Sequence, residues 1–316
     1  FYIIDVTPAL LLVFYLSDRG APIYYLYDKA SKQGKRLFSG SRKLEGLSLA
    51  EMKPIAYQAR DGLTLHGYLT TPVGVPATGL PLVLLVHGGP WVRDMWGYDP
   101  EVQWLANRGY AVLQVNYRGS TGYGRKFYMA GFREWGGKMQ NDLTDGVQWA
   151  IKQGIADPKR VAIMGASYGG FAVLAGVAFT PDLYVAGVDL CGPPNLCAYA
   201  ERVAGGTTGY GDEVEAAVGH PVKDHKRLLA HSPLTAAEKI KAPLLIGQGV
   251  HDPRITVEES EQMVNTLRQL GKPVEYLRYP DEGHGLARLE NRLDFYGHAE
   301  QFLTKYLGGR CEPSAK

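Results

Sequence analysis

The first 52 residues show the spacing of apolar runs and turn residues that is typical of short β-strands. Two strand-like segments, "PALLLVFYLS" and "PIYYLYDKA", are joined by the turn sequence "DRGA". The segment "GKRLF" follows as a further strand. Runs rich in β-branched and aromatic residues, bounded by Gly, Pro and Asp, predict strands joined by turns. Residues 1–52 are therefore predicted to form a β-rich N-terminal segment, a β meander.

A different pattern begins at residue 53. Two strands joined by an "RDG" turn precede "LPLVLLV", a continuous apolar run typical of a strand buried on both faces. Helix-like and strand-like segments then alternate, which predicts a mostly parallel, twisted sheet with helices on both faces. We expect residues 53–316 to form this α/β domain, with the leading strand pair as its antiparallel edge. The glycine-rich stretch 192–240 interrupts the alternation and is expected to be irregular.

Composition and charge narrow the class of protein. The chain has 316 residues, 45% of them hydrophobic, which is enough for a large core. The 34 basic and 32 acidic side chains nearly balance, so neither nucleic acid nor a membrane surface is expected as a partner. Cys191, Cys197 and Cys311 follow no metal-ligand spacing, and we expect reduced thiols in a cytoplasmic protein. The run "ALLLVFYL" is too short to span a bilayer.

The segment "GASYGG" at residues 165–170 is the first candidate for chemistry. It lies between the apolar run "RVAIM" and the helix-like "FAVLAGVAF". In a strand-turn-helix context, G-x-S-x-G forces a sharp turn that exposes the serine side chain. The alternative is a glycine turn whose serine only caps the helix. The surrounding α/β alternation favours Ser167 as a nucleophile, because the helix N-terminus also favours negative charge.

A serine nucleophile needs a base and an acid, and both are expected in loops that follow later strands. Asp252 follows the strand "PLLIGQG", and His284 follows the strand "VEYLRYP". The carboxyl ends of parallel strands meet at one edge of a sheet, so these residues can reach Ser167. The acid holds the imidazole in the correct tautomer and stabilises its charged form. Other residues near the same edge are Asp189, Asp281 and Glu282 as alternative acids, and His251 as a second histidine.

An oxyanion site is predicted at "HGGP", residues 87–90, directly after the buried strand "LPLVLLV". Glycines allow a backbone N–H to approach a ligand closely, and the residue after the nucleophile supplies the second donor. Gly89 and Tyr168 are therefore the expected donors, and His87 is expected to brace the loop. The alternative is a plain Gly-Gly-Pro turn. Four aromatic residues near these loops could shape an apolar pocket: Trp91, Trp96, Tyr199 and Tyr210.

Taken together, the motifs resemble those of a known family. The segments "HGGP", "NYRGSTGYG", "GASYGG", "HDPR" and "PDEGHG" occur in this order over residues 50–310. They resemble the prolyl oligopeptidase family of serine peptidases, most closely its acylaminoacyl peptidase branch. The resemblance implies an α/β-hydrolase fold, with Ser167 as nucleophile, Asp252 as acid and His284 as base. It implies Gly89 and Tyr168 as oxyanion donors and no cofactor or metal.

The resemblance also raises a question about the N-terminal segment. Family members carry a β-propeller that covers the active site, and each blade needs about 40 residues. Residues 1–52 resemble only the last blade, and the chain begins with Phe1, so we expect a fragment or a processed product. A site without its propeller is expected to be open. Openness favours small esters over peptides, and an unpaired sheet edge favours a homodimer.

Three functional hypotheses follow from the sequence. The first is a serine peptidase that cleaves short or N-acylated peptides through an acyl-enzyme. The second is a carboxylesterase that uses the same residues on short-chain esters. The third is a non-catalytic hydrolase scaffold, which the complete set of catalytic residues disfavours. The preferred side chain of the substrate and its binding residues do not follow from the sequence.

Overall fold

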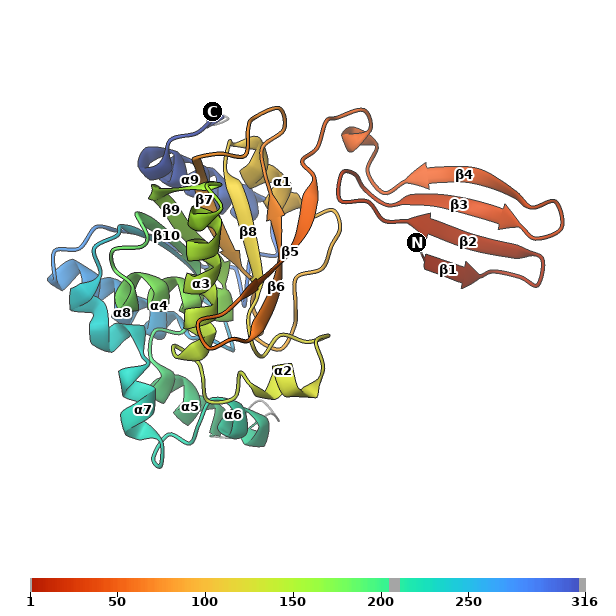
Figure 1. Ribbon diagram of the computed structural model, residues 1–316. Coiled ribbons are helices and arrows are strands. Elements are labelled where there is room, and N and C mark those ends of the chain that lie inside the picture. The colour runs from red at the N-terminus through yellow and green to blue at the C-terminus, as the bar shows by residue number, and fades with distance from the viewer. Residues whose placement is uncertain (1, 205–210, 313–316) are drawn as a thin grey trace.

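The computed structural model describes residues 2–204 and 211–312, which contain two separate β-sheets. The first sheet has four strands and projects from one side of the molecule (Figure 1). The second has eight strands and lies at the centre of the larger part of the chain (Figure 1). None of the helices within the described residues is long and apolar enough to cross a membrane.

The four-stranded sheet is an antiparallel meander, as predicted from the pattern. Its neighbouring strands are consecutive along the chain. An aromatic row crosses the sheet, with ring centroids 5.1 Å apart for Tyr2 and Phe14 and 4.6 Å apart for Tyr24 and Phe38. The first strand was not predicted. The strands are β1 (Tyr2–Asp5), β2 (Leu10–Tyr15), β3 (Ile23–Asp28) and β4 (Gln33–Ser39), followed by a 3₁₀ turn at Arg42–Leu44.

The loop between β2 and β3 anchors this meander to the larger part of the molecule. Asp18 is only 4% exposed, and its Oδ2 accepts a hydrogen bond of 2.8 Å from the N–H of Met52. The Gln103 side-chain amide donates to the carbonyl oxygens of Asp18 and Ala50. Because these buried groups satisfy one another, the two parts of the chain meet through specific polar contacts.

The eight-stranded sheet has the order β12-β11-β10-β9-β7-β8-β6-β5. Strands β7 to β12 run parallel, and β6 and β5 form an antiparallel edge, as predicted. Every residue of β7 and β8 is buried, which accounts for the continuous apolar run of β7. The strands are β5 (Met52–Gln58), β6 (Thr64–Thr70), β7 (Leu80–Val86), β8 (Ala111–Asn116), β9 (Ala156–Ala166), β10 (Ala186–Leu190), β11 (Leu244–Gly249) and β12 (Val274–Tyr279).

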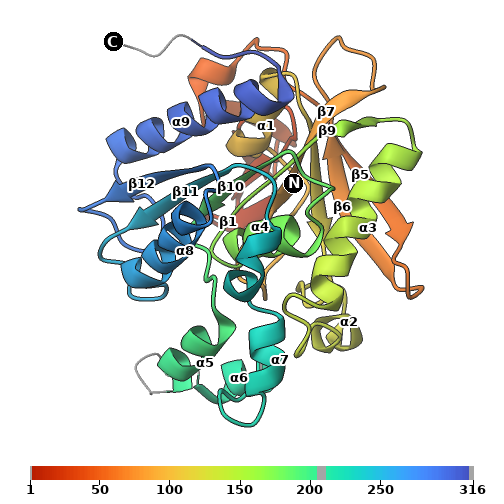
Figure 2. The same ribbon diagram turned by 90° about the vertical axis from the view of Figure 1, so that its left-hand side faces the viewer.

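Helices cover both faces of this sheet (Figure 2). Helices α1 and α9 contribute to one buried apolar cluster, and α3, α4 and α8 contribute to the other. The predicted mostly parallel sheet with helices on both faces is therefore confirmed. These helices are α1 (Pro100–Asn107), α3 (Lys138–Lys152), α4 (Tyr168–Phe179), α8 (Val257–Gln269) and α9 (Leu289–Leu307).

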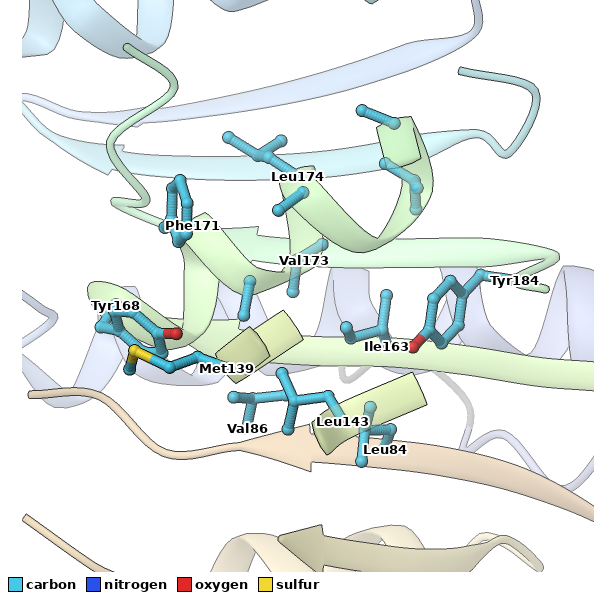
Figure 3. Packing of buried hydrophobic residues seen from close by; sticks show 14 of the residues in the cluster. Leu84, Val86, Met139, Leu143, Ile163, Tyr168, Phe171, Val173, Leu174 and Tyr184 are labelled. Carbon is cyan, nitrogen blue, oxygen red and sulfur yellow. The ribbon is translucent and has the colours of Figure 1, made fainter. Parts of the chain in front are cut away.

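Helix α4 is apolar on all sides because neighbouring elements surround it. Eleven of its twelve residues are buried. Tyr168 and Phe171 lie near Met139 of α3 and Val86 of β7 in the packed core (Figure 3). The Tyr168 ring also packs edge-on against Trp135, with centroids 4.6 Å apart. The first turn of α4 is thus fixed by its side chains, and so is the strand-to-helix turn before it.

The stretch 192–240 is where the sequence prediction is wrong. Its described residues form short helices that lie beside one another at one end of the molecule (Figure 2). Buried apolar side chains such as Leu196, Val214 and Leu228 join them to the core that contains α4. The shorter helices of the chain are α2 (Arg125–Met129), α5 (Leu196–Ala204), α6 (Gly211–Ala217), α7 (His225–Ala230) and the 3₁₀ segment η2 (Pro233–Lys239).

Candidate active site

Ser167 occupies the turn between β9 and α4 in an unusual backbone conformation. Its φ is +59°, in the left-handed region that non-glycine residues rarely adopt. A Cβ on Gly165 would lie 2.7 Å from the carbonyl oxygen of Val86, and a Cβ on Gly169 would clash with the same oxygen. Only glycine fits at these two positions. The small residues of "GASYGG" therefore serve the sharp turn that holds Ser167 at the carboxyl edge of the sheet.

Ser167, His284 and Asp252 form a continuous hydrogen-bonded chain. Nε2 of His284 lies 2.9 Å from Ser167 Oγ, and Nδ1 lies 2.7 Å from Oδ2 of Asp252. Each residue follows a parallel strand, because β9, β11 and β12 end at Ala166, Gly249 and Tyr279. The sheet thus brings together three side chains that are far apart in sequence. This is the geometry expected of a nucleophile, a base and a group that orients the base.

The Asp252 carboxylate is buried and held by several donors. Its Oδ1 accepts the N–H groups of Arg254 at 2.8 Å and Ile255 at 3.0 Å. Burial alone raises the pKa of Asp252, but hydrogen bonds from His284 and these N–H groups outweigh burial and leave the pKa below its usual value. Asp252 is therefore ionised at neutral pH and can accept a hydrogen bond from the Nδ1–H of His284.

Gln248 braces the Asp252 loop, and the sequence analysis did not single it out. Its buried amide donates to the carbonyl oxygens of Gly249 and Ile255, and Ser260 Oγ donates to its Oε1 at 2.7 Å. These bonds join both ends of the loop to α8. The signal in the sequence is a polar residue inside the otherwise apolar strand "PLLIGQG", since a buried amide requires partners.

The alternative acids have other partners in the structure. Asp189 is 1% exposed, and its Oδ1 accepts the N–H of Gly192 at 2.8 Å. Its Oδ2 has no hydrogen-bond partner within the described residues, and burial raises its pKa well above the usual value. Burial therefore favours the neutral form of Asp189. Glu282 accepts the N–H groups of Ala287 and Arg288, so it shapes the His284 loop instead.

The two remaining candidate residues near His284, Asp281 and His251, are both exposed. Asp281 forms an ion pair of 2.9 Å with Arg288, and both side chains are exposed. The N–H of His251 donates to the carbonyl oxygen of Glu282, and His251 itself is exposed. The hydrogen bond from His251 connects the Asp252 loop to the His284 loop.

The "HGGP" loop lies against the serine turn. A Cβ on Gly88 would lie 3.6 Å from Cβ of Ser167, and Gly89 has a φ of +110°. The loop is braced by His87, whose Nε2 lies 3.0 Å from Ser120 Oγ and whose ring stacks on Tyr117. Burial lowers the pKa of His87 to about 4, so its ring is neutral. Gly89 and Tyr168 remain predicted oxyanion donors.

The aromatic candidates are engaged in packing. Tyr199 stacks on Trp135 with centroids 5.5 Å apart, and Trp91 packs against the core. Trp96 is 44% exposed, and its Nε1–H donates to the carbonyl oxygen of Met52. Tyr210 lies outside the described residues. The apolar specificity pocket stays a prediction.

An acid-lined cavity of about 230 Å³ opens beside the serine turn. Gly88 and Ala166 line it, together with the carboxyl groups of Asp94, Asp99 and Glu101. Asp94 Oδ2 is buried and has no hydrogen-bond partner within the described residues. Burial, and the nearby charge of Asp99, raise the pKa values of Asp94 and Glu101 to about 7. Ionisation of these carboxyl groups therefore has a free-energy cost, which lowers the stability of the folded state.

This cost predicts a pH-dependent effect of Asp94→Asn. Because the folded pKa is raised from 3.8 to about 7, the neutral acid contributes stability that is lost as pH rises from about 4 to about 7. The amide cannot ionise, so Asp94→Asn is expected to stabilise the protein more at pH 8 than at pH 5, by about 2–3 kcal/mol. Urea unfolding at the two pH values measures the difference. The exposed control Asp182→Asn is expected to give little difference, and an Asp94→Asn effect that is independent of pH would contradict the assignment.

Comparison with known proteins places this geometry in a family. The family model described as "Prolyl oligopeptidase family" matches residues 96–310. The chain is 48% identical over 314 residues to dipeptidyl aminopeptidase BIII of Pseudoxanthomonas mexicana, covering 96% of this chain and 46% of the relative. It is 28% identical over 238 residues to the acylamino-acid-releasing enzyme of Arabidopsis thaliana, covering 72% of this chain and 30% of that enzyme.

A solved structure agrees with these similarities. The puromycin-hydrolyzing peptidase of Mycobacterium tuberculosis superimposes with a TM-score of 0.86 at 27% identity, over 96% of this chain and 47% of the peptidase. The chain spans less than half the length of the curated relatives that it matches. The fold is the α/β-hydrolase fold of these peptidases, preceded by an antiparallel meander. The chain therefore belongs to the prolyl oligopeptidase family of serine peptidases.

Proposed function

We propose that this chain is a serine peptidase that cleaves short or N-acylated peptides through an acyl-enzyme. The observation that carries the proposal is the chain of two short hydrogen bonds that links Ser167, His284 and Asp252. Membership of a peptidase family and similarity to a dipeptidyl aminopeptidase, an acylamino-acid-releasing enzyme and a puromycin-hydrolyzing peptidase support it.

In the proposed mechanism, Ser167 Oγ attacks the scissile carbonyl carbon while His284 Nε2 accepts the hydroxyl proton. Asp252 holds the Nδ1 proton and stabilises the imidazolium. The carbonyl oxygen becomes an oxyanion, and the N–H groups of Gly89 and Tyr168 are the proposed donors to it. Tyr168 begins α4, so its N–H has no acceptor within the helix and the helix dipole favours negative charge there.

In the rest of the reaction, His284 acts first as a general acid and then again as a general base. The imidazolium gives its proton to the leaving amine, the carbon–nitrogen bond breaks, and the acyl group remains on Ser167. Water then attacks the ester carbonyl carbon as His284 accepts its proton; the bond to Ser167 Oγ breaks as His284 returns that proton to Oγ, and the acid product leaves. None of these steps requires a metal or a cofactor.

The proposal predicts one acyl-enzyme for two classes of substrate. A peptide anilide and an ester that share an acyl group are expected to give the same ratio of hydrolysis to transfer onto added hydroxylamine, because both ratios reflect a common intermediate. Short unactivated peptides are expected to be cleaved as well, which mass spectrometry detects, with Ser167→Ala as the blank. Hydrolysis of the ester without any cleavage of the anilide or of peptides would identify a carboxylesterase.

Other properties are also proposals. Residues 1–52 and 53–316 are proposed as the two structural parts; the first sheet ends at Ser39, and the second begins at Met52, one residue before this boundary. A cytoplasmic location is supported by three free cysteines, at positions 191, 197 and 311. A homodimer stays a prediction, which the sedimentation mass would test. No nucleic-acid or membrane partner is expected from the balanced charge.

A further inference from the structure

Cys191 lies inside the hydrogen-bonded site, although the proposed mechanism does not use it. It directly follows β10 and is 1% exposed. Its N–H donates to the carbonyl oxygen of Gly247, which fixes the backbone at 2.9 Å. The strand β10 pairs with β9, and the Cys191 sulfur lies within 4.8 Å of a ring nitrogen of His284, so the thiol sits close to the base.

The thiol completes a set of ligand atoms. Cys191 Sγ, a carboxylate oxygen of Asp252 and a ring nitrogen of His284 all lie within 4.8 Å of one another. Across residues 2–204 and 211–312, this is the only group of three Cys, His, Asp or Glu side chains with that property. Thiolate, imidazole and carboxylate are the ligands that zinc prefers in proteins. We propose that these three side chains form a binding site for a zinc-like divalent cation that inhibits the enzyme.

The distances suit such a cation after small movements. Ligand bonds of about 2.0–2.3 Å in a tetrahedron place neighbouring ligand atoms about 3.3–3.8 Å apart. Nδ1 of His284 and Oδ2 of Asp252 are 2.7 Å apart, so the cation would replace the proton between them and separate them slightly. Cys191 and Asp252 are buried, whereas the His284 side chain is 17% exposed and offers the route of entry.

Binding at this site blocks catalysis through His284. A cation on Nδ1 leaves the ring proton on Nε2, which then cannot accept the Ser167 proton. A cation on Nε2 occupies the accepting atom itself. Burial, with the charge of Asp252, raises the pKa of the Cys191 thiol, so binding must release one proton from sulfur to solvent. No electron transfer is involved.

The inhibition test compares two cysteines. ZnCl₂ and CdCl₂ are titrated into the wild type, Cys191→Ala and Cys197→Ala, with MgCl₂ as a hard-cation control. Cys197 is also buried, but its sulfur lies near His225 instead of His284. Loss of one ligand is expected to raise the half-inhibitory Zn²⁺ concentration at least about tenfold in Cys191→Ala. Cys197→Ala is expected to behave as the wild type, and EDTA is expected to reverse the inhibition. Equal inhibition of Cys191→Ala and the wild type would overturn the proposal.

A second test does not depend on activity, because the inhibitory consequence rests on the proposed function but cation binding does not. Co²⁺ added to Ser167→Ala is expected to produce a thiolate-to-cobalt charge-transfer band. The band is expected to be absent from the Ser167→Ala, Cys191→Ser double variant, which keeps the size of the side chain. A band that persists without Cys191, or no band with Cys191 present, contradicts the site. An enzyme that binds Co²⁺ but cleaves nothing contradicts the proposed function alone.

Discussion

Ser167→Ala is expected to lower kcat by roughly 10⁴ to 10⁶ on any substrate of this chain, because it removes the attacking oxygen. Ser167 Oγ lies 2.9 Å from His284 Nε2 and at the start of α4, and within this hydrogen-bonded chain it is the hydroxyl that contacts the base. His284→Ala is expected to cost a similar factor, since the residues act as a unit. Steady-state kinetics of both variants, at substrate concentrations that separate kcat from KM, measure the loss.

The control for this prediction is a serine outside the site. Ser31 is exposed in the turn between β3 and β4, where its hydroxyl bonds Asp28. Ser31→Ala is expected to retain wild-type kcat. All variants are first compared in thermal unfolding, because a loss of fold would also abolish activity. Retention of more than about a hundredth of kcat in folded Ser167→Ala would rule out this serine as the nucleophile.

Asp252→Asn is expected to lower kcat about 10⁴-fold while the fold is retained. The carboxylate accepts a hydrogen bond of 2.7 Å from the Nδ1–H of His284, whereas an amide can donate to Nδ1 and stabilise the wrong tautomer. The effect should appear in kcat and leave KM nearly unchanged, because Asp252 is buried beneath the histidine and does not face the substrate.

Asp189→Asn is the matched control, since it changes another buried carboxyl group at the same edge of the sheet. Burial keeps Asp189 neutral, so an amide of the same shape is expected to reduce kcat by less than about tenfold. The assignment of the acid fails if Asp189→Asn is the inactive variant and Asp252→Asn retains most of its activity.

The strands and long helices could be predicted because their signals are local. The run "LPLVLLV" becomes β7, buried along its whole length, and the helix-like "FAVLAGVAF" lies in α4. Strand β1 and the short helices of 192–240 were missed. Helices α5, α6 and α7 have nine, seven and six residues, which is too short for a clear helical period, and Leu196, Val214 and Leu228 hold one helix each against the core. Short helices of this kind depend on tertiary contacts.

In the candidate site, too, some features could be predicted from the sequence and others could not. Ser167, Asp252 and His284 could be predicted because each follows a strand, and the topology of a parallel sheet brings such positions together. Cys191 also follows a parallel strand, β10, but neither the direction of its thiol nor the place of Asp94 beside the site could be predicted. Their proximity depends on loop conformations: a φ of +50° at Cys191, and a bond of 2.8 Å from the N–H of Asp94 to Asn116. The spacing of residues along the sequence does not indicate these contacts.

The most direct test of the central claim, that Ser167 is the nucleophile of a serine peptidase, is the site of covalent labelling by a fluorophosphonate. Peptide mass mapping of the labelled chain is expected to locate one adduct, on Ser167, with loss of peptide hydrolysis in proportion to labelling. Ser167→Ala is expected to remain unlabelled. An adduct on another residue, or peptide hydrolysis that continues after complete labelling of Ser167, would contradict the account.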